Sequence, residues 1–229
     1  MKLKQIFLII AICVTFRSFG QEGIGAWYIY NGSYYTSAST EIFFETQVRL
    51  REPLSNKEEI FFRPIFIHHF NKKWNAGLGY TYHLNFSNAS SGDNSKFSHE
   101  NRIILQAQIY TPIQKTNIQH RLRLEQRWIT IESTSETEIK QRFRYRLQAT
   151  IPLGNEKIEA GTFFLNIYNE LFINLHEISF DQNRLYGATG YQFTPSTNLQ
   201  IGYLIQYKNE QVFHRLQFFL TQKIFFYDK

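Results

Sequence analysis

Six arginines stand at alternate positions in two neighbouring segments of the chain, within residues 117–153. They are Arg121, Arg123, Arg127, Arg142, Arg144 and Arg146. Each guanidinium group presents a planar fork of N–H donors that matches carboxylate and phosphate oxygens. If these side chains share one face, they can bind an anionic solute or be neutralised by acidic side chains of the same protein.

Apolar side chains occupy the opposite parity of the same segments, for example Leu122 and Leu124 in the first and Tyr145 and Leu147 in the second. A repeat of two residues indicates β-strands, so residues 117–153 are predicted to form a β-hairpin. In a soluble sheet the apolar face covers a core and the arginines meet water. In a membrane barrel the apolar face meets lipid and the arginines point into the lumen.

Arginines inside a lumen need counter-charges, because an unpaired buried charge costs several kcal/mol. Glu125 and Glu170 are the nearest candidates, with Glu41, Glu45 and Glu100 on other segments. The candidate lumen-facing polar cluster is Arg121, Arg123, Glu125, Arg127, Arg142, Arg144, Arg146, Glu170 and Arg184. The favoured interpretation is a network of arginine and glutamate that fills the lumen. The alternative is a site for a small anionic solute.

The first twenty residues have the features of a secretory signal peptide. Lys2 and Lys4 precede an apolar run over residues 6–16, and small residues occupy Ser18 and Gly20. The run is too short for a helix that spans a bilayer. We therefore predict a cleaved signal peptide over residues 1–20 and one barrel domain over residues 21–229. The single cysteine, Cys13, falls in the leader, so no disulfide is expected.

Composition restricts the class of protein. Aromatic residues make up 17% of the chain, yet the mean hydropathy is −0.36 and no long apolar run follows residue 20, which excludes a helical membrane protein. A transmembrane barrel and a soluble β-sandwich both fit this mixture. Loss of Lys2, Lys4 and Arg17 with the leader lowers the formal net charge from +6 to +3. Basic residues alternate with apolar ones instead of clustering, so no nucleic-acid partner is expected.

Alternation of polar and apolar residues continues along most of the chain. Short turns are predicted near residues 72, 113, 154 and 195, and longer polar connections near 55, 91, 135 and 178. This arrangement is typical of barrels with short periplasmic turns and longer outer loops. The pattern contains eleven candidate strands, but bacterial single-chain barrels have even numbers. We therefore expect an antiparallel barrel of about ten strands, with twelve as the alternative. The count of eleven is expected to fail either at residues 23–35, which would not join as one full strand, or at residues 159–173, which would contain a break.

Several runs resemble a bacterial outer-membrane family, the domain of unknown function 2490. They are residues 25–28, 120–128, 143–147, 169–174, 180–186 and 190–193, which include the two arginine segments. The resemblance covers roughly residues 23–220. It implies a small barrel in the cell outer membrane of a Gram-negative, Bacteroidetes-type bacterium, surrounded by outer-membrane lipid. It implies no activity that can be transferred.

An outer-membrane lipid-modifying enzyme, of the lipase or acyltransferase type, is the main functional alternative. Such an enzyme needs a serine close to a histidine. His120 and His214 have no serine nearby on their strands, and Ser98 and His99 are neighbours that point apart. The acidic segment 132–138 lacks a regular spacing of metal ligands, so no cofactor is expected. A soluble periplasmic β-protein is the third alternative. The favoured role is structural, or limited binding or transport of a solute.

Overall fold

The computed structural model describes residues 23–86 and 97–227. The predicted signal peptide and most of the polar connection near residue 91 lie outside these residues. No helix in the described ranges is long and apolar enough to cross a membrane. The described residues form eleven strands: β1 Gly25–Ser37, β2 Thr40–Glu52, β3 Ser55–His69, β4 Trp74–Phe86, β5 Phe97–Ile113, β6 Thr116–Ile131, β7 Glu136–Leu153, β8 Phe163–Asn174, β9 Ser179–Thr194, β10 Thr197–Lys208 and β11 Gln211–Phe225.

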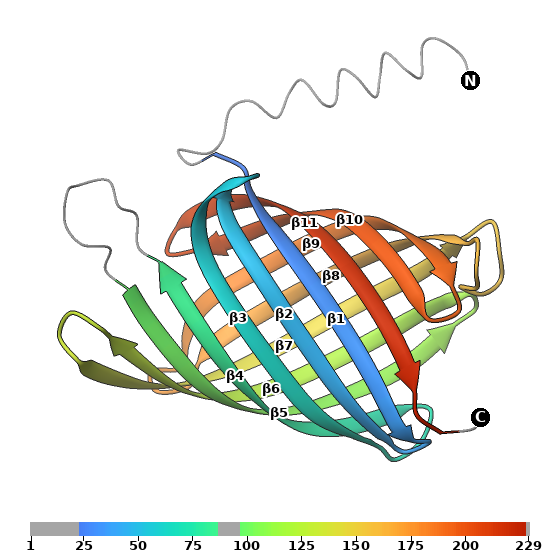
Figure 1. Ribbon diagram of the computed structural model, residues 1–229, viewed down its shortest axis with the longest axis horizontal. Helices are drawn as coiled ribbons and strands as arrows, with labels where there is room; N and C mark the ends of the chain where they lie inside the picture. Colours follow the sequence, from blue (N-terminus) through green and yellow to red (C-terminus); the bar gives the residue numbers. More distant parts are fainter. Residues whose placement is uncertain (1–22, 87–96, 228–229) are drawn as a thin grey trace, which may run out of the picture.

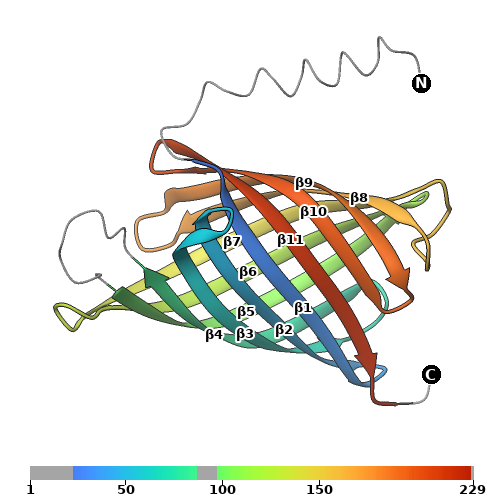
Figure 2. The same ribbon diagram turned by 45° about the horizontal axis from the view of Figure 1, so that its top comes forward.

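The strands form one closed barrel (Figure 1). Each strand pairs in antiparallel orientation with the strand that follows it in sequence. The exception is the seam, where β1 and β11 run side by side in the same direction (Figures 1 and 2). Their parallel pairing extends from Gly25 opposite Arg215 to Tyr35 opposite Phe225. Closure leaves no free edge along the wall.

The all-β barrel was predicted correctly, and its eleven strands are one more than the expected number of about ten. The expectation of a purely antiparallel barrel was wrong. An even number is required only when the first and last strands pair in antiparallel orientation. Here the seam is parallel, so an odd number of strands closes the barrel. The suspected first segment forms a full strand that pairs on both sides. The other suspected segment starts later than expected, since β8 begins at Phe163.

The predicted sorting of short and long connections was also wrong. The connection between β2 and β3 is only residues 53–54, although it was expected to be long, whereas residues 154–162 form an extended connection between β7 and β8. Polar residues near 55 and 135 continue the strands instead of forming loops. Glu59 pairs with Asn85, and Glu136 pairs with Ile131. Composition misled because strands can carry polar side chains beyond the apolar part of a barrel.

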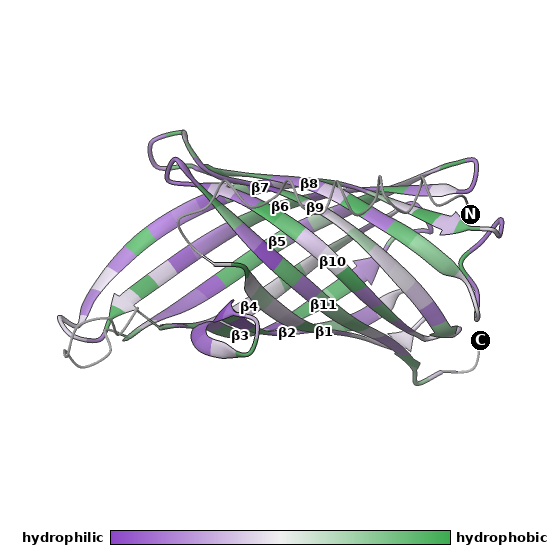
Figure 3. Ribbon diagram, turned by 90° about the horizontal axis from the view of Figure 1, so that it is seen from above, coloured by the Kyte–Doolittle hydropathy of each residue, from purple (hydrophilic) through white to green (hydrophobic). Residues whose placement is uncertain are grey.

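The two faces of the wall have opposite chemistry, in agreement with the reversed polarity predicted for a barrel. Side chains inside are largely polar and buried, such as Arg123, Glu125 and Gln217, each at most 2% exposed. Outward side chains are largely apolar and exposed, such as Leu105 at 54% and Leu124 at 47%. Figure 3 shows these classes alternating along the strands.

One sector of the interior is filled by apolar and aromatic side chains, which the alternation pattern did not predict. Trp27, Ile29, Tyr168, Tyr186, Ala188 and Leu204 form a buried cluster, with Phe219 packed against it. Glycines make room for the large rings. A Cβ atom at Gly190 would lie 2.3 Å from the ring of Phe164, and one at Gly202 would lie 2.5 Å from the ring of Tyr186. Aromatic rings over glycines on the neighbouring strand thus fill this side of the barrel.

The first prediction concerns these rings. Gly190→Ala should destabilise the barrel by about 1–3 kcal/mol, because the new methyl group overlaps the ring of Phe164. Gly187→Ala on the same strand is the control, since no atom lies within 4 Å of its added Cβ. Thermal unfolding, followed by the heat-dependent gel mobility of the folded barrel, measures the difference. Equal stability of both variants would contradict the packing described here.

Candidate functional site: an arginine-lined lumen

The lumen contains a cavity of about 500 Å³ to which all eleven strands contribute side chains. Pockets for small molecules are typically about 300–1,000 Å³. Among the described residues, ten arginines and two lysines line the cavity, against five glutamates. The lining of the cavity therefore carries more positive than negative side chains.

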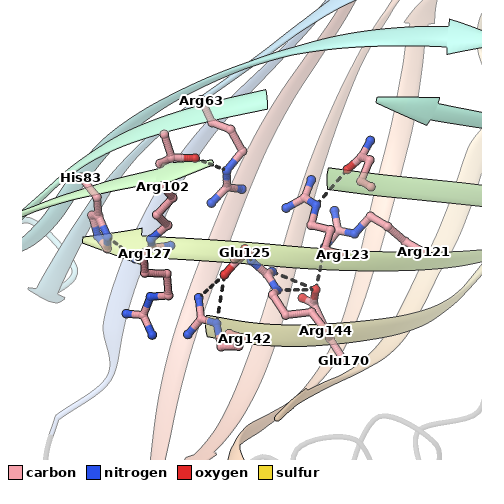
Figure 4. Close-up of polar contacts among 12 residues, drawn as sticks. Arg63, His83, Arg102, Arg121, Arg123, Glu125, Arg127, Arg142, Arg144 and Glu170 are labelled. Atoms are coloured by element: carbon pink, nitrogen blue, oxygen red, sulfur yellow. Dashed lines mark hydrogen bonds and ion pairs between the residues drawn. The ribbon is translucent and has the colours of Figure 1, made fainter. Parts of the chain in front are cut away.

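The nine residues predicted as the polar cluster lie together inside the barrel. Eight of them line the cavity, and the ninth, Glu125, is buried beside it. Figure 4 shows how β6 supplies Arg121, Arg123 and Arg127, and how β7 supplies Arg142 and Arg144. These side chains share a face because each strand turns alternate residues inward.

Two buried glutamates hold the centre of the cluster (Figure 4). Glu170 Oε1 accepts hydrogen bonds from Arg121 Nη2 at 2.7 Å and from Arg144 Nη2 at 2.8 Å. Glu125 accepts from Arg144 Nη1 at 2.6 Å and from Arg142 Nη2 at 2.6 Å. Each carboxylate is thus shared by two arginines, and Arg144 bridges both carboxylates. Glu125 and Glu170, the two glutamates predicted as the nearest counter-charges, do bind arginines of the cluster.

A second cluster is formed by side chains of β2 to β6. Arg102 and Arg127 both donate to Glu100 Oε1 at 2.5 Å. His83 Nε2 lies 3.1 Å from a carboxylate oxygen of Glu59, which also binds Arg49. The sequence had suggested Glu100 as a counter-charge, but Arg102 and His83 were not recognised as its partners. Their inward parity was the available signal.

Two β-bulges bring additional acids into the wall. The register shifts between Arg49 and Leu50 on β2, which leaves Glu58 of β3 as an extra residue, and a similar shift leaves Asp181 of β9 unpaired. A bulge re-aims the side chain of the extra residue. Glu58 lies 3.1 Å from Arg215 and Asp181 lies 2.9 Å from Arg142.

The strand register places arginines directly opposite one another. Arg121 faces Arg146 and Arg123 faces Arg144 across β6 and β7, and Arg102 faces Arg127 across β5 and β6. Like charges directly opposite one another on one face of a sheet destabilise it. A wall built only for stability would alternate acids with these bases. The pairing instead concentrates positive charge on one side of the lumen.

Three cavity-lining arginines have no ion pair with any carboxylate of the described residues: Arg123, Arg146 and Arg184. Arg123 Nε donates to Gln106 at 2.8 Å, and Arg146 Nη2 donates to Gln119 at 2.9 Å. Buried nitrogens of all three, Nη1 of Arg123 and Nε of the other two, have no hydrogen-bond partner in the described part of the chain.

Aromatic rings support several of these guanidinium groups. The Cζ of Arg184 lies 5.0 Å from the ring centroid of Trp27 and 4.8 Å from that of Phe172. Arg144 and Arg146 lie over Phe172 and Tyr168 at 4.3 and 5.3 Å. Ring faces attract cations but do not remove their net charge. The sequence analysis did not predict inward aromatics such as Tyr168 and Phe172, because it sorted side chains by polarity.

The charge balance of the lumen remains positive after every close acid is counted. Glu125 and Asp181, which bind Arg142, bring the acids to seven against twelve cations. Five positive charges therefore remain, with the histidines neutral. Such an excess in a partly enclosed cavity favours anions.

The histidines considered for an enzyme lie outside this cluster. His120 Nδ1 is 2.8 Å from the Tyr145 hydroxyl, His214 Nδ1 is 2.8 Å from the Tyr203 hydroxyl, and His99 Nδ1 is 2.7 Å from Glu132. These contacts differ from the serine and histidine pair that acyl transfer requires. Within the described ranges, no group of three or more His, Cys, Asp or Glu side chains could hold a metal ion.

The fold and the lumen define a class of protein: a closed β-barrel with an apolar outer face and a cationic interior. The chain belongs to the family "Protein of unknown function (DUF2490)", whose match covers residues 24–217 and so nearly the whole described barrel. Comparison with curated proteins and with solved structures found no match.

The second prediction follows from the shared carboxylates. Glu170→Gln should destabilise the barrel by about 3 kcal/mol, because Arg121 and Arg144 lose their common acceptor charge. Arg144→Gln in the same chain should recover part of the loss, with a coupling of about 1 kcal/mol or more. Glu138→Gln, in an exposed pair with Lys140, is the control and should change stability little. Additive effects of Glu170→Gln and Arg144→Gln would contradict this arrangement.

Proposed function

We propose that this protein is an outer-membrane β-barrel whose cationic lumen admits and binds small anionic solutes. The observation that carries the proposal is the cavity of about 500 Å³, whose lining has five more positive than negative charges. The outer face supports the membrane location, and the inner face supports the choice of solute.

The outer face has the chemistry that lipid requires. Exposed aliphatic side chains from several strands form its middle, including Leu78, Leu105, Leu124, Leu147 and Ile167. Soluble monomers rarely expose contiguous apolar patches larger than a few hundred Å². Each strand has 12–18 residues, and a tilted transmembrane strand needs about 9–11. An apolar face of this kind is consistent with a bilayer, whereas in water it would favour aggregation.

Aromatic side chains gather toward both ends of the barrel. At one end the rings of Phe70 and Trp74 stack at 3.9 Å, and Phe163 packs against Tyr191 at 4.7 Å. At the other end Phe180 lies 5.7 Å from Tyr207. Girdles of aromatic residues at both interfaces are typical of transmembrane barrels. The presence of such rings toward both ends supports a bilayer between them.

The inner face supports an anionic solute over a cation or an apolar ligand. Arginine forks bind oxyanions through paired hydrogen bonds, and the low polarity of a partly enclosed site strengthens the attraction. Every pair of neighbouring strands is hydrogen-bonded around the barrel, so a solute would have to enter through an end of the lumen. Lys208 and Lys223, close to opposite ends of the barrel, also line the cavity.

The third prediction tests the membrane location. The parent protein should fractionate with the outer membrane, and Leu124→Arg should destabilise it by about 2–4 kcal/mol, because an arginine near the bilayer midplane loses its hydration. Leu147→Arg should behave alike. The control is Gln148→Ser, on the inward parity of β7, which should be much milder. Recovery in the soluble periplasmic fraction, or equal tolerance at both parities, would overturn the membrane location.

The fourth prediction tests the solute. In planar bilayers with a salt gradient, the parent barrel should give a reversal potential that indicates anion selectivity, because the cavity lining is cationic. Replacing both Lys208 and Lys223 by glutamine should reduce that selectivity. Lys157→Gln, in the exposed connection between β7 and β8, should not change it. A silent or cation-selective parent would overturn the proposed passage of anions.

A further inference from the structure

We propose that the lumen holds a specific site for a water-soluble oxyanion with at least two negative charges, of the phosphate or phosphate-monoester class. The site comprises Arg121, Arg123, Arg146 and Arg184. This inference deepens the proposed function and rests on it, since it names the class of anion and the side chains that bind it.

The four arginines are brought together by the register of neighbouring strands. Arg121 faces Arg146, Arg146 faces Glu170, and Glu170 faces Arg184, so one row crosses β6, β7, β8 and β9. Arg123 lies two residues from Arg121 on the same inward face of β6, and both are labelled in Figure 4. All four side chains line the cavity. The row therefore presents several guanidinium groups to one volume.

Glu170 is the one carboxylate in this row, and two arginines already bind it. It binds Arg121 at 2.7 Å and Arg144 at 2.8 Å. Arg123, Arg146 and Arg184 consequently retain their full charge with respect to carboxylates of the described residues. Arg123 is only 2% exposed, and the buried Nε of Arg184 has no hydrogen-bond partner among the described residues. Buried cations without a counter-charge are costly, so an external anion would stabilise the folded barrel.

The geometry of the donors selects the kind of anion. Four guanidinium groups offer more N–H donors than a halide or one carboxylate can accept, whereas a phosphoryl group offers several oxygens around one centre. A dianion also compensates two of the three unpaired arginines at once. The ring faces of Trp27 and Phe172 are covered by Arg49, Arg144 and Arg184, so recognition depends on charge and hydrogen bonds rather than on stacking.

The closed wall decides between two sources of phosphate. Each neighbouring pair of strands is hydrogen-bonded, including the parallel seam between β1 and β11. A lipid headgroup cannot reach the row sideways through such a wall. The cavity of about 500 Å³ is larger than inorganic phosphate and leaves room for a small organic group. The ligand is thus a soluble phosphate compound, and inorganic phosphate is a sufficient probe of the site.

The fifth prediction uses the full mature barrel in uncharged detergent. Inorganic phosphate, far above its dissociation constant, should raise the unfolding temperature by about 5–10 °C. Chloride or acetate at matched ionic strength should not. The Arg146→Gln, Arg184→Gln double variant should lose this shift and bind phosphate at least tenfold more weakly by calorimetry. Lys157→Gln, outside the cavity, should keep it.

Neither substitution breaks an ion pair among the described residues, so the variants should fold, and without phosphate they should unfold at the parent temperature or above it. If the double variant does not fold, Arg184→Gln alone serves as the test. An equal shift with chloride, no shift with phosphate, or a full shift in a folded variant would overturn the site. So would stabilisation only by vesicles that contain anionic lipid, because that result would place the anion on the outer face.

The outcomes separate this inference from the proposed function. Anion-selective conductance without a preference for phosphate would leave the proposed function standing and overturn the site. A phosphate-dependent shift that the double variant loses, in a barrel that does not conduct, would support the site and overturn the proposed passage of anions.

Discussion

The balance of charge inside the barrel is the constraint on which the rest of the structure depends. When the eleven strands close into a barrel, every second side chain points into the confined lumen. In β5, β6 and β7 many of those side chains are arginines. Confinement makes each guanidinium group expensive unless an acceptor is near. Glu125 and Glu170 meet this need by serving two arginines each. Their shared hydrogen bonds tie β6, β7 and β8 together from within.

Acidic residues at β-bulges, and aromatic rings, stabilise other arginines of the interior. Glu58 and Asp181 are extra residues in their strands, and the irregular register lets them reach Arg215 and Arg142. Aromatic rings also stabilise the guanidinium groups. Trp27 and Phe172 lie against guanidinium groups, while Tyr186 and Phe164 cover glycines of neighbouring strands. The interior is thus divided between a cationic sector and a packed aromatic sector.

The compensation of charge is incomplete, and this excess of cations supports the proposed binding of anions over a charge-balanced plug. Acids opposite Arg121 and Arg123 would have neutralised the wall, yet the register places Arg146 and Arg144 there. The resulting excess of cations surrounds a cavity of small-molecule size. Within a family of unknown function, this excess gives a physical reason to look first for an anionic ligand.

Much of this architecture was predictable from the sequence because a strand has a period of two. Alternation alone assigned the inward face of the arginine hairpin, the apolar outer face and the all-β fold, and it selected Glu125 and Glu170 as counter-charges. Candidate strands could also be counted, and the count of eleven was correct. The assumption that the count must be even was the error.

Only the tertiary structure decided how the strands meet. Parallel closure between β1 and β11 depends on pairing between segments about 190 residues apart, which local alternation does not encode. The same holds for register: which arginine faces Arg121, and which arginines share Glu170, is set by the alignment of neighbouring strands. Inward aromatics such as Phe172 were invisible to a pattern that sorts residues by polarity. The sequence therefore determined which side chains enter the lumen, whereas strand pairing determined which of them remain without a counter-charge.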